Sequence, residues 1–267
     1  ARPAGEKFVL SVPFEGASFP MTVVPPRKKG DTTPANGGDA APGHGGDAAP
    51  PVVLDLFWNT VASHFQLETP VLCWVDKYTP TEFSDAGRDS WRKFLHTVSF
   101  AVGGDPDRFW LTGFSWSGHA GFDVAEHRPG LVRGFVALGG GPRRNHFRLL
   151  PNLATTRVIS CVGAKDDPGL VWNLKELARI APSLRLDLHF TLDPDGGHRL
   201  PLEGMDAVAA LIDAAPALPA TLARAGSLLA DGDQVALPWL EIVEVDRKAV
   251  EVPDRIPVSS TLGPDEQ

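Results

Sequence analysis

Residues 108–120 read Arg108-Phe-Trp-Leu-Thr-Gly-Phe-Ser-Trp-Ser-Gly-His-Ala120. The segment from Phe109 to Thr112 is apolar, aromatic and β-branched, and it predicts a buried strand. A helical pattern follows Gly118, so Ser115 falls at a tight turn between a strand and a helix. Such a turn exposes the serine hydroxyl at the top of a sheet and needs small neighbours, because the two backbones approach closely. The alternative is a Gly/Ser-rich turn that only closes a strand.

The composition is that of a globular chain large enough for one sizeable core. The chain has 267 residues, of which 43% are hydrophobic, and we expect a single soluble domain over residues 1–267. Its formal net charge is −8, so no basic surface indicates binding to nucleic acid. No apolar run approaches the ~20 residues of a membrane span. The chain begins with Ala1, which is compatible with a processed precursor and a secreted or periplasmic location.

The two cysteines do not indicate a compartment. Cys73 and Cys161 both lie in apolar, strand-like runs. This setting favours buried free thiols over a disulfide. With two cysteines and no Cys/His cluster, the sequence also argues against a structural zinc site.

Predicted strands alternate with predicted helices through the middle of the chain. Apolar runs predict strands at 52–57, 70–75, 109–112, 131–138, 158–162 and 184–192, the last nearer a sheet edge. Apolar spacing predicts helices at 84–101, from Ser115 to about residue 127, at 170–180 and at 205–212. This alternation indicates βαβ units and a mostly parallel sheet.

The flanking segments predict additions to that sheet. Residues 7–13 and 18–25 predict two short strands. Residues 26–50 are rich in Gly, Pro and Ala and predict a flexible loop. The C-terminal extension, 217–267, contains apolar runs at 238–245 and 249–252 that predict a β-hairpin. Residues 139–152 are expected to form a loop.

The stretch around Ser115 resembles the G-x-S-x-G nucleophile elbow of the α/β-hydrolase superfamily. Residues 105–113 are similar to the corresponding segment of its compact esterases, which include dienelactone-hydrolase-like, phospholipase/carboxylesterase-like and polyhydroxybutyrate-depolymerase-like members. One departure is that Ser117 stands in place of the second glycine, and Gly118 follows it. The resemblance covers roughly residues 51–215. It implies an α/β-hydrolase fold, a mostly parallel central sheet flanked by helices, here with N-terminal and C-terminal β additions. It implies no cofactor and no metal.

A serine hydroxyl is a poor nucleophile, so the elbow needs a histidine base and an acid that orients this base. In the superfamily the three follow in the order Ser, acid, His. The chain supplies Ser115, Asp166 or Asp167, and His198 in that order, each after a predicted strand. The carboxyl ends of parallel strands gather such groups. The joint occurrence favours a catalytic triad over separate roles as a solvated histidine and helix-capping aspartates.

The choice between the two aspartates rests on their neighbours. In similar hydrolases the acid follows a glycine by three residues, which selects Asp166 after Gly163. The same families often have Asp-Pro at this place, which selects Asp167 before Pro168. We prefer Asp166, because Asp167 is well placed to cap the following helix.

The resemblance also implies an oxyanion hole made of two backbone N–H groups. One donor is the N–H of Trp116, which follows the nucleophile. The second comes from the loop after the strand 52–57, where relatives carry His-Gly and this chain carries Phe-Trp58-Asn. Trp58 can serve because a backbone donor needs no particular side chain. His119 is expected to be structural, since it points along its helix.

The expected activity is cleavage of a carboxylic ester of a small molecule through an acyl-enzyme, with a Ser-His-Asp triad. The alternatives are a peptidase of the same fold and a catalytically inactive hydrolase-fold binding protein. Arg143 and Arg144 lie in the loop that should overhang Ser115. They are candidates to hold a substrate carboxylate or phosphate. The alternative is a solvated loop whose charges offset neighbouring acids.

Overall fold

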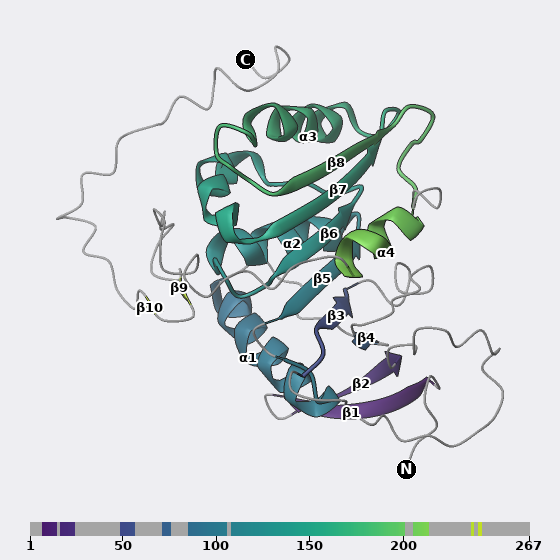
Figure 1. The fold of residues 1–267 in the computed structure, drawn as a ribbon, viewed down its shortest axis with the longest axis vertical. Coiled ribbons are helices and arrows are strands. Elements are labelled where there is room, and N and C mark those ends of the chain that lie inside the picture. The colour runs from purple at the N-terminus through teal and green to yellow at the C-terminus, as the bar shows by residue number, and fades with distance from the viewer. Residues whose placement is uncertain are drawn as a thin grey trace.

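A computed structural model describes residues 7–14, 17–24, 49–56, 71–75, 85–105, 108–200, 205–213, 236–237 and 240–241. Most of these residues belong to one twisted sheet with helices packed against both of its faces (Figure 1). The strands are β1 Phe8–Phe14, β2 Ala17–Val24, β3 Val52–Asp55, β4 Val71–Val75, β5 Phe109–Phe114, β6 Gly134–Leu138, β7 Arg157–Gly163 and β8 Leu188–Asp193. The helices are α1 Asp85–Val102, α2 Trp116–His127, α3 Pro168–Ile180 and α4 Met205–Asp213.

The sheet has the strand order β1-β2-β4-β3-β5-β6-β7-β8. All neighbouring pairs from β4 to β8 are parallel, whereas β2 pairs antiparallel with β4 and β1 antiparallel with β2. The mostly parallel sheet and its N-terminal β addition are therefore confirmed. β8 lies at the sheet edge, as its alternating pattern predicts.

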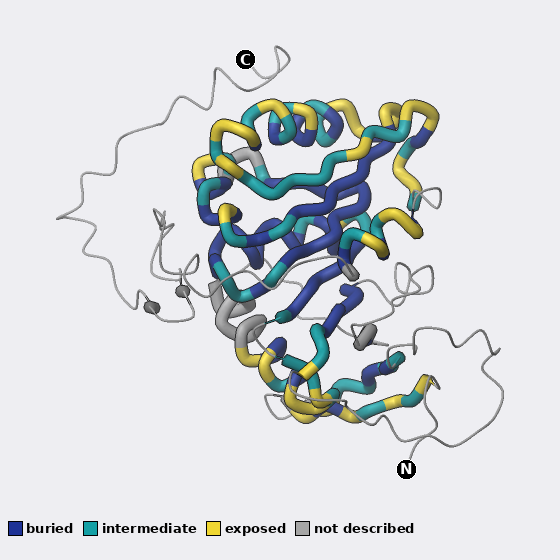
Figure 2. The backbone as a smooth tube through the Cα atoms, in the orientation of Figure 1, coloured by how far each residue is buried: buried dark blue, intermediate teal, exposed yellow. Residues whose placement is uncertain are grey.

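Two apolar layers hold the sheet between the helices. Side chains of α1, α2 and α3, such as Phe94, Phe122 and Leu174, pack with one face of the strands. The opposite face carries alternate strand residues, such as Trp110, and packs against Met205 and Ala209 of α4. The central strands are buried along their length (Figure 2). Burial on both faces explains why these strands read as continuous apolar runs.

One predicted loop is wrong. Residues expected to form a loop up to residue 152 instead enter a 3₁₀ segment, η2 Arg144–Thr155, which packs against α2. Leu149, Leu150 and Leu153 are fully buried there. The segment is therefore stabilised by burial of its leucines, which outweighs the helix-breaking tendency of Pro151 inside it.

β8 begins four residues later than expected, because the chain first closes α3 with a tight turn. The N–H of Leu186 donates to the carbonyl of Ala181, and Arg185 adopts a φ of 55°. A residue in this left-handed region cannot continue a strand.

The C-terminal β addition is present in short form. β10 Leu240–Glu241 pairs antiparallel with β9 Ala236–Leu237, which precedes it in the sequence. The prediction instead pairs residues 238–245 with residues 249–252. That predicted partner, residues 249–252, lies outside the described residues, and so does the predicted flexible loop up to residue 48. Within the described part of the chain, no helix has both the length and the apolar character that crossing a membrane requires. Cys73 and Cys161 are buried free thiols, as predicted.

Candidate active site

Ser115 lies at a sharp turn between β5 and α2. Its φ is 56° and its ψ is −121°, a conformation that side-chain-bearing residues rarely adopt. The Ser115 N–H donates to the carbonyl of Leu138 at 2.7 Å, which fixes the turn against the end of β6. The strained turn that the sequence predicts is therefore present in the structure.

Small residues make this turn sterically feasible. A Cβ atom on Gly113 would lie 2.6 Å from Cβ of Ser117, and one on Gly140 would lie 2.6 Å from the carbonyl oxygen of Ser115. Ser117 replaces the usual glycine without a clash, because its side chain points to the end of β3. Its Oγ donates to the carbonyl of Leu56 at 3.1 Å.

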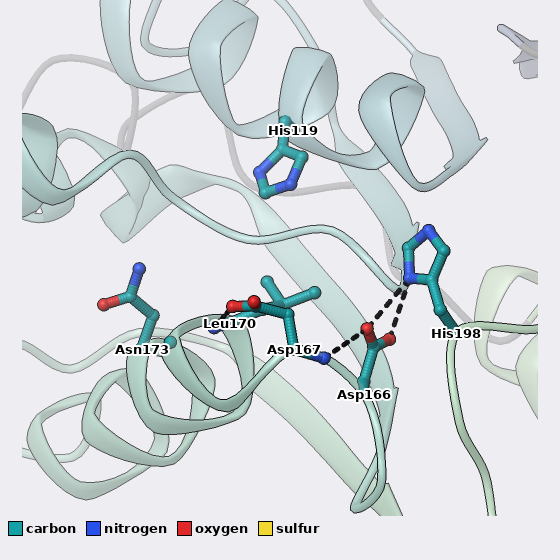
Figure 3. A pocket seen from close by; sticks show the side chains of 7 residues that line it. His119, Asp166, Asp167, Leu170, Asn173 and His198 are labelled. Carbon is teal, nitrogen blue, oxygen red and sulfur yellow. Dashed lines mark hydrogen bonds and ion pairs between the residues drawn. The ribbon is translucent and has the colours of Figure 1, made fainter.

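The loops after β7 and β8 bring Asp166 and His198 to Ser115. The Oγ atom of Ser115 lies 2.8 Å from Nε2 of His198. Nδ1 of the same ring lies 3.0 Å from both carboxylate oxygens of Asp166, as Figure 3 shows. The Asp166 side chain is 2% exposed and that of His198 is 48% exposed. The ring of Phe114 stacks near the imidazole, at 5.1 Å between centroids.

The two aspartates that the sequence left as alternatives have different partners. Asp166 faces His198, whereas Oδ1 of Asp167 accepts a hydrogen bond from the N–H of Leu170 at 3.0 Å. Asp167 is thus the N-cap of α3, and Pro168 follows it at the first helical position.

The acid loop and the histidine loop cross in direct backbone contact. The N–H of Ala164 donates to the carbonyl of Asp193 at 2.7 Å, and the N–H of Lys165 donates to the carbonyl of Gly196 at 2.8 Å. A Cβ atom on Gly163 would lie 2.4 Å from the backbone of Gly196. Gly163, near the predicted acid, is therefore required by this crossing.

His119 lies on the first turn of α2 and contacts the loop after β6. The Gly141 N–H donates to its Nδ1 at 3.1 Å, and the Gly141 carbonyl oxygen lies 2.5 Å from the same atom. Burial lowers the pKa of His119 below its ordinary value, and the charge of Arg143 adds to this effect. These contacts agree with the structural role expected for His119.

A pocket of about 550 Å³ opens beside the histidine. It is lined by His119, Asp166, Asp167, Gly169, Leu170, Asn173 and His198 (Figure 3). The sequence analysis did not single out Asn173, because this residue lies among the apolar positions of α3 that are predicted to face the core. The signal that could have found it is an amide between the buried residues Val171 and Leu174.

The remaining predicted site residues are only partly placed. Trp116 is the first residue of α2, and the residue is 50% exposed. Trp58 and the side chain of Arg144 lie outside the described residues, and Arg143 precedes η2 near His119. Binding of an anionic group by the two arginines stays a prediction. Among the residues that the structure describes, no three His, Cys, Asp or Glu side chains could together hold a metal ion.

Comparisons with known proteins give matches at the level of structure. No protein-family model and no curated protein sequence matches the chain. A dienelactone hydrolase from Anabaena variabilis is similar, with a TM-score of 0.54 and 17% identity over 79% of this chain and 97% of that one. The S-formylglutathione hydrolase of Staphylococcus aureus has a TM-score of 0.54 and 10% identity over 80% and 98% of the two chains. The acylaminoacyl peptidase of Pyrococcus horikoshii has a TM-score of 0.53 and 9% identity over 79% of this chain and 42% of that one.

The neighbours share the arrangement of the sheet with this chain at low sequence identity. The chain therefore has the α/β-hydrolase fold.

Proposed function

We propose that the chain is a serine hydrolase that cleaves a carboxylic ester of a small molecule through an acyl-enzyme intermediate. The observation that supports this most is the continuous series of contacts at the turn after β5. Ser115 Oγ lies 2.8 Å from His198 Nε2, and His198 Nδ1 lies 3.0 Å from Asp166. This is the arrangement that turns a serine hydroxyl into a nucleophile.

In the proposed reaction, Ser115 Oγ attacks the ester carbonyl carbon while its proton passes to Nε2 of His198. The tetrahedral intermediate collapses by breaking the bond to the alcohol oxygen, which takes the proton from His198. A water molecule then attacks the acyl-serine with His198 again as base. The carboxylic acid leaves and the proton returns to Ser115, so the enzyme is unchanged after each cycle.

Asp166 and two backbone N–H groups stabilise the charges that form during the proposed reaction. Asp166 is nearly buried and accepts the Nδ1–H of His198, so it fixes the ring orientation and stabilises the imidazolium that forms. Trp116 is the first residue of α2 and directly follows Ser115, so its N–H lies at the amino end of the helix, beside the proposed nucleophile. We assign this N–H to the oxyanion, with the N–H of Trp58 as the proposed second donor.

A fluorophosphonate probe tests the proposal directly, since it labels only an activated serine. We expect labelling of the native protein at Ser115, no labelling of Ser115→Ala, and none of heat-denatured protein. Ser115→Ala should also lose ~10⁶-fold in kcat on a short activated ester.

The two alternatives give different results in the same assays. A peptidase of this fold would take the probe and cleave a matched amide in preference to the ester. An inactive binding protein would neither be labelled nor cleave either substrate, and that result would reject the proposed function.

A further inference from the structure

The pocket beside His198 contains two polar side chains that the proposed reaction does not use. Asp166 and His198 belong to the triad, and Asp167 caps α3. His119 and Asn173 are the two others, and Figure 3 shows them on the two walls of the pocket, His119 on α2 and Asn173 on α3.

Asn173 is an unusual residue for its position. It is only 8% exposed, and its Oδ1 is buried without a hydrogen-bond partner among the residues that the structure describes. Its helix neighbours Val171 and Leu174 are buried apolar residues, so an apolar side chain would suit the packing there. A buried amide without a partner is costly and calls for an explanation. Its position on the wall of a pocket supplies one, because a bound group can complete its hydrogen bonds.

His119 presents its second ring nitrogen to the same pocket. Nδ1 lies against both the N–H and the carbonyl oxygen of Gly141, so Nε2 is the ring nitrogen left for a bound group, as a donor or an acceptor according to the tautomer. The pocket therefore offers a ring nitrogen from one wall and a side-chain amide from the other.

The position of the pocket indicates which part of an ester would enter it. In the sheet, β3 lies on one side of β5, whereas β6, β7 and β8 lie on the other. The proposed oxyanion loop follows β3, and α3 follows β7. The pocket is thus on the side of His198, where the leaving alcohol must take its proton.

We propose that His119 and Asn173 form a subsite for a hydroxyl group in the alcohol part of the ester, so that polyol esters are preferred over alkyl esters. This inference rests on the proposed function. A hydroxyl can donate one hydrogen bond and accept others, so it can pair with the ring nitrogen of His119 in either tautomer and with the amide of Asn173. The carboxylates of Asp166 and Asp167 on the same wall disfavour an anionic group.

The substrate test compares 2,3-dihydroxypropyl butyrate with propyl butyrate. The native protein should prefer the dihydroxypropyl ester in kcat/KM. Asn173→Leu should reduce this preference about tenfold, the effect of losing one neutral hydrogen bond, mainly through KM. His119→Asn should reduce this preference similarly, since the asparagine amide can still contact Gly141 but has no atom in the place of Nε2. Lys175→Leu, an exposed position on the same helix, is the matched control and should keep the native preference.

A binding measurement separates this inference from the proposed function. In a Ser115→Ala background, calorimetry with dihydroxypropyl butyrate should show about tenfold weaker binding when Asn173→Leu is added. If neither ester is hydrolysed, the proposed function fails and the binding comparison still decides the subsite. Equal preference for the two esters in the native protein and both variants, or binding unchanged by Asn173→Leu, would overturn the subsite. Thermal unfolding of each variant verifies that it folds.

Discussion

Ser115 carries backbone strain that the proposed chemistry requires, and this strain can be measured. At a φ of 56°, alanine is as strained as serine, whereas glycine is not. We expect Ser115→Gly to unfold with a free energy ~1 kcal/mol higher than that of Ser115→Ala, while both variants are inactive. Denaturant titrations of the two variants provide the comparison. Equal stabilities would mean that the turn is relaxed.

The two neighbouring aspartates should separate cleanly in activity and stability. Asp166→Asn should lower kcat by ~10⁴-fold, because His198 loses the carboxylate that orients it. Asp167→Asn keeps a side-chain oxygen for the Leu170 N–H, so it should cost at most about 1 kcal/mol of stability and little activity. Steady-state kinetics and thermal unfolding of both variants test this, and the reverse ranking would reassign the acid to Asp167.

His119 should make the protein less stable in mildly acidic solution. Burial lowers its folded-state pKa below the ordinary value of 6.5, so the unfolded chain takes up a proton first as the pH falls. Its contribution to stability is complete above that ordinary value and decreases as the pH falls towards the lowered pKa. Unfolding free energies measured across this range should fall more steeply for the native protein than for His119→Asn. Parallel curves would contradict the prediction.

The proximity of Ser115, Asp166 and His198 could be predicted from the sequence, but the pocket could not. Ser115, Asp166 and His198 each follow a strand, and the carboxyl ends of parallel strands meet at one sheet edge, so their proximity follows from order along the chain. Asn173 lies within a helix whose pattern is otherwise apolar on one side. Only the folded structure, in which α3 lies beside the loops that carry Asp166 and His198, shows that Asn173 lines a pocket.

At the scale of elements, the crossing of the loops after β7 and β8 sets the distance between Asp166 and His198. Gly163→Ala should place its Cβ 2.4 Å from the backbone of Gly196, so one loop must shift. We expect a loss of about 1–3 kcal/mol in stability. Activity should fall by about 10²-fold, since a displacement of about 1 Å is enough for this.

Gly197→Ala is the control for that prediction, because it lies in the same crossing with room for a methyl group. The nearest atom to its Cβ would be 3.7 Å away, an ordinary contact. It should change stability and activity little. If the Gly163 and Gly197 variants behaved alike, the close approach of the two loops would not be what positions His198.

Elements with strong periodicity could be predicted, and those held only by tertiary contacts could not. α1, α3 and the central strands follow from apolar spacing. The 3₁₀ segment η2 has an arginine-rich start and an internal proline, so its sequence is typical of a loop. It forms because its leucines are buried against the rest of the molecule, and local sequence cannot show this burial.

At the scale of the whole molecule, the two thiols report on global unfolding. Cys73 lies in β4 and Cys161 in β7, in the cores on opposite faces of the same sheet. Burial raises the pKa of both thiols, that of Cys161 to about 11, with the charge of Asp193 adding to the effect. Because the thiolate is the reactive species, neither cysteine should react in the folded protein at about pH 8.

A thiol-reactive disulfide reagent tests this in native buffer and in urea. Both cysteines should react promptly once the chain is unfolded, and the slow native reaction should have the same rate for each, because exposing either one requires separation of the whole sheet from its helices. Mass spectrometry after partial labelling distinguishes the two sites. Rapid labelling of Cys161 alone would mean that β8 and α4 open without the rest of the molecule. In that case the loop carrying His198, which follows β8, would belong to a locally unstable edge of the sheet, and activity would be lost before global unfolding.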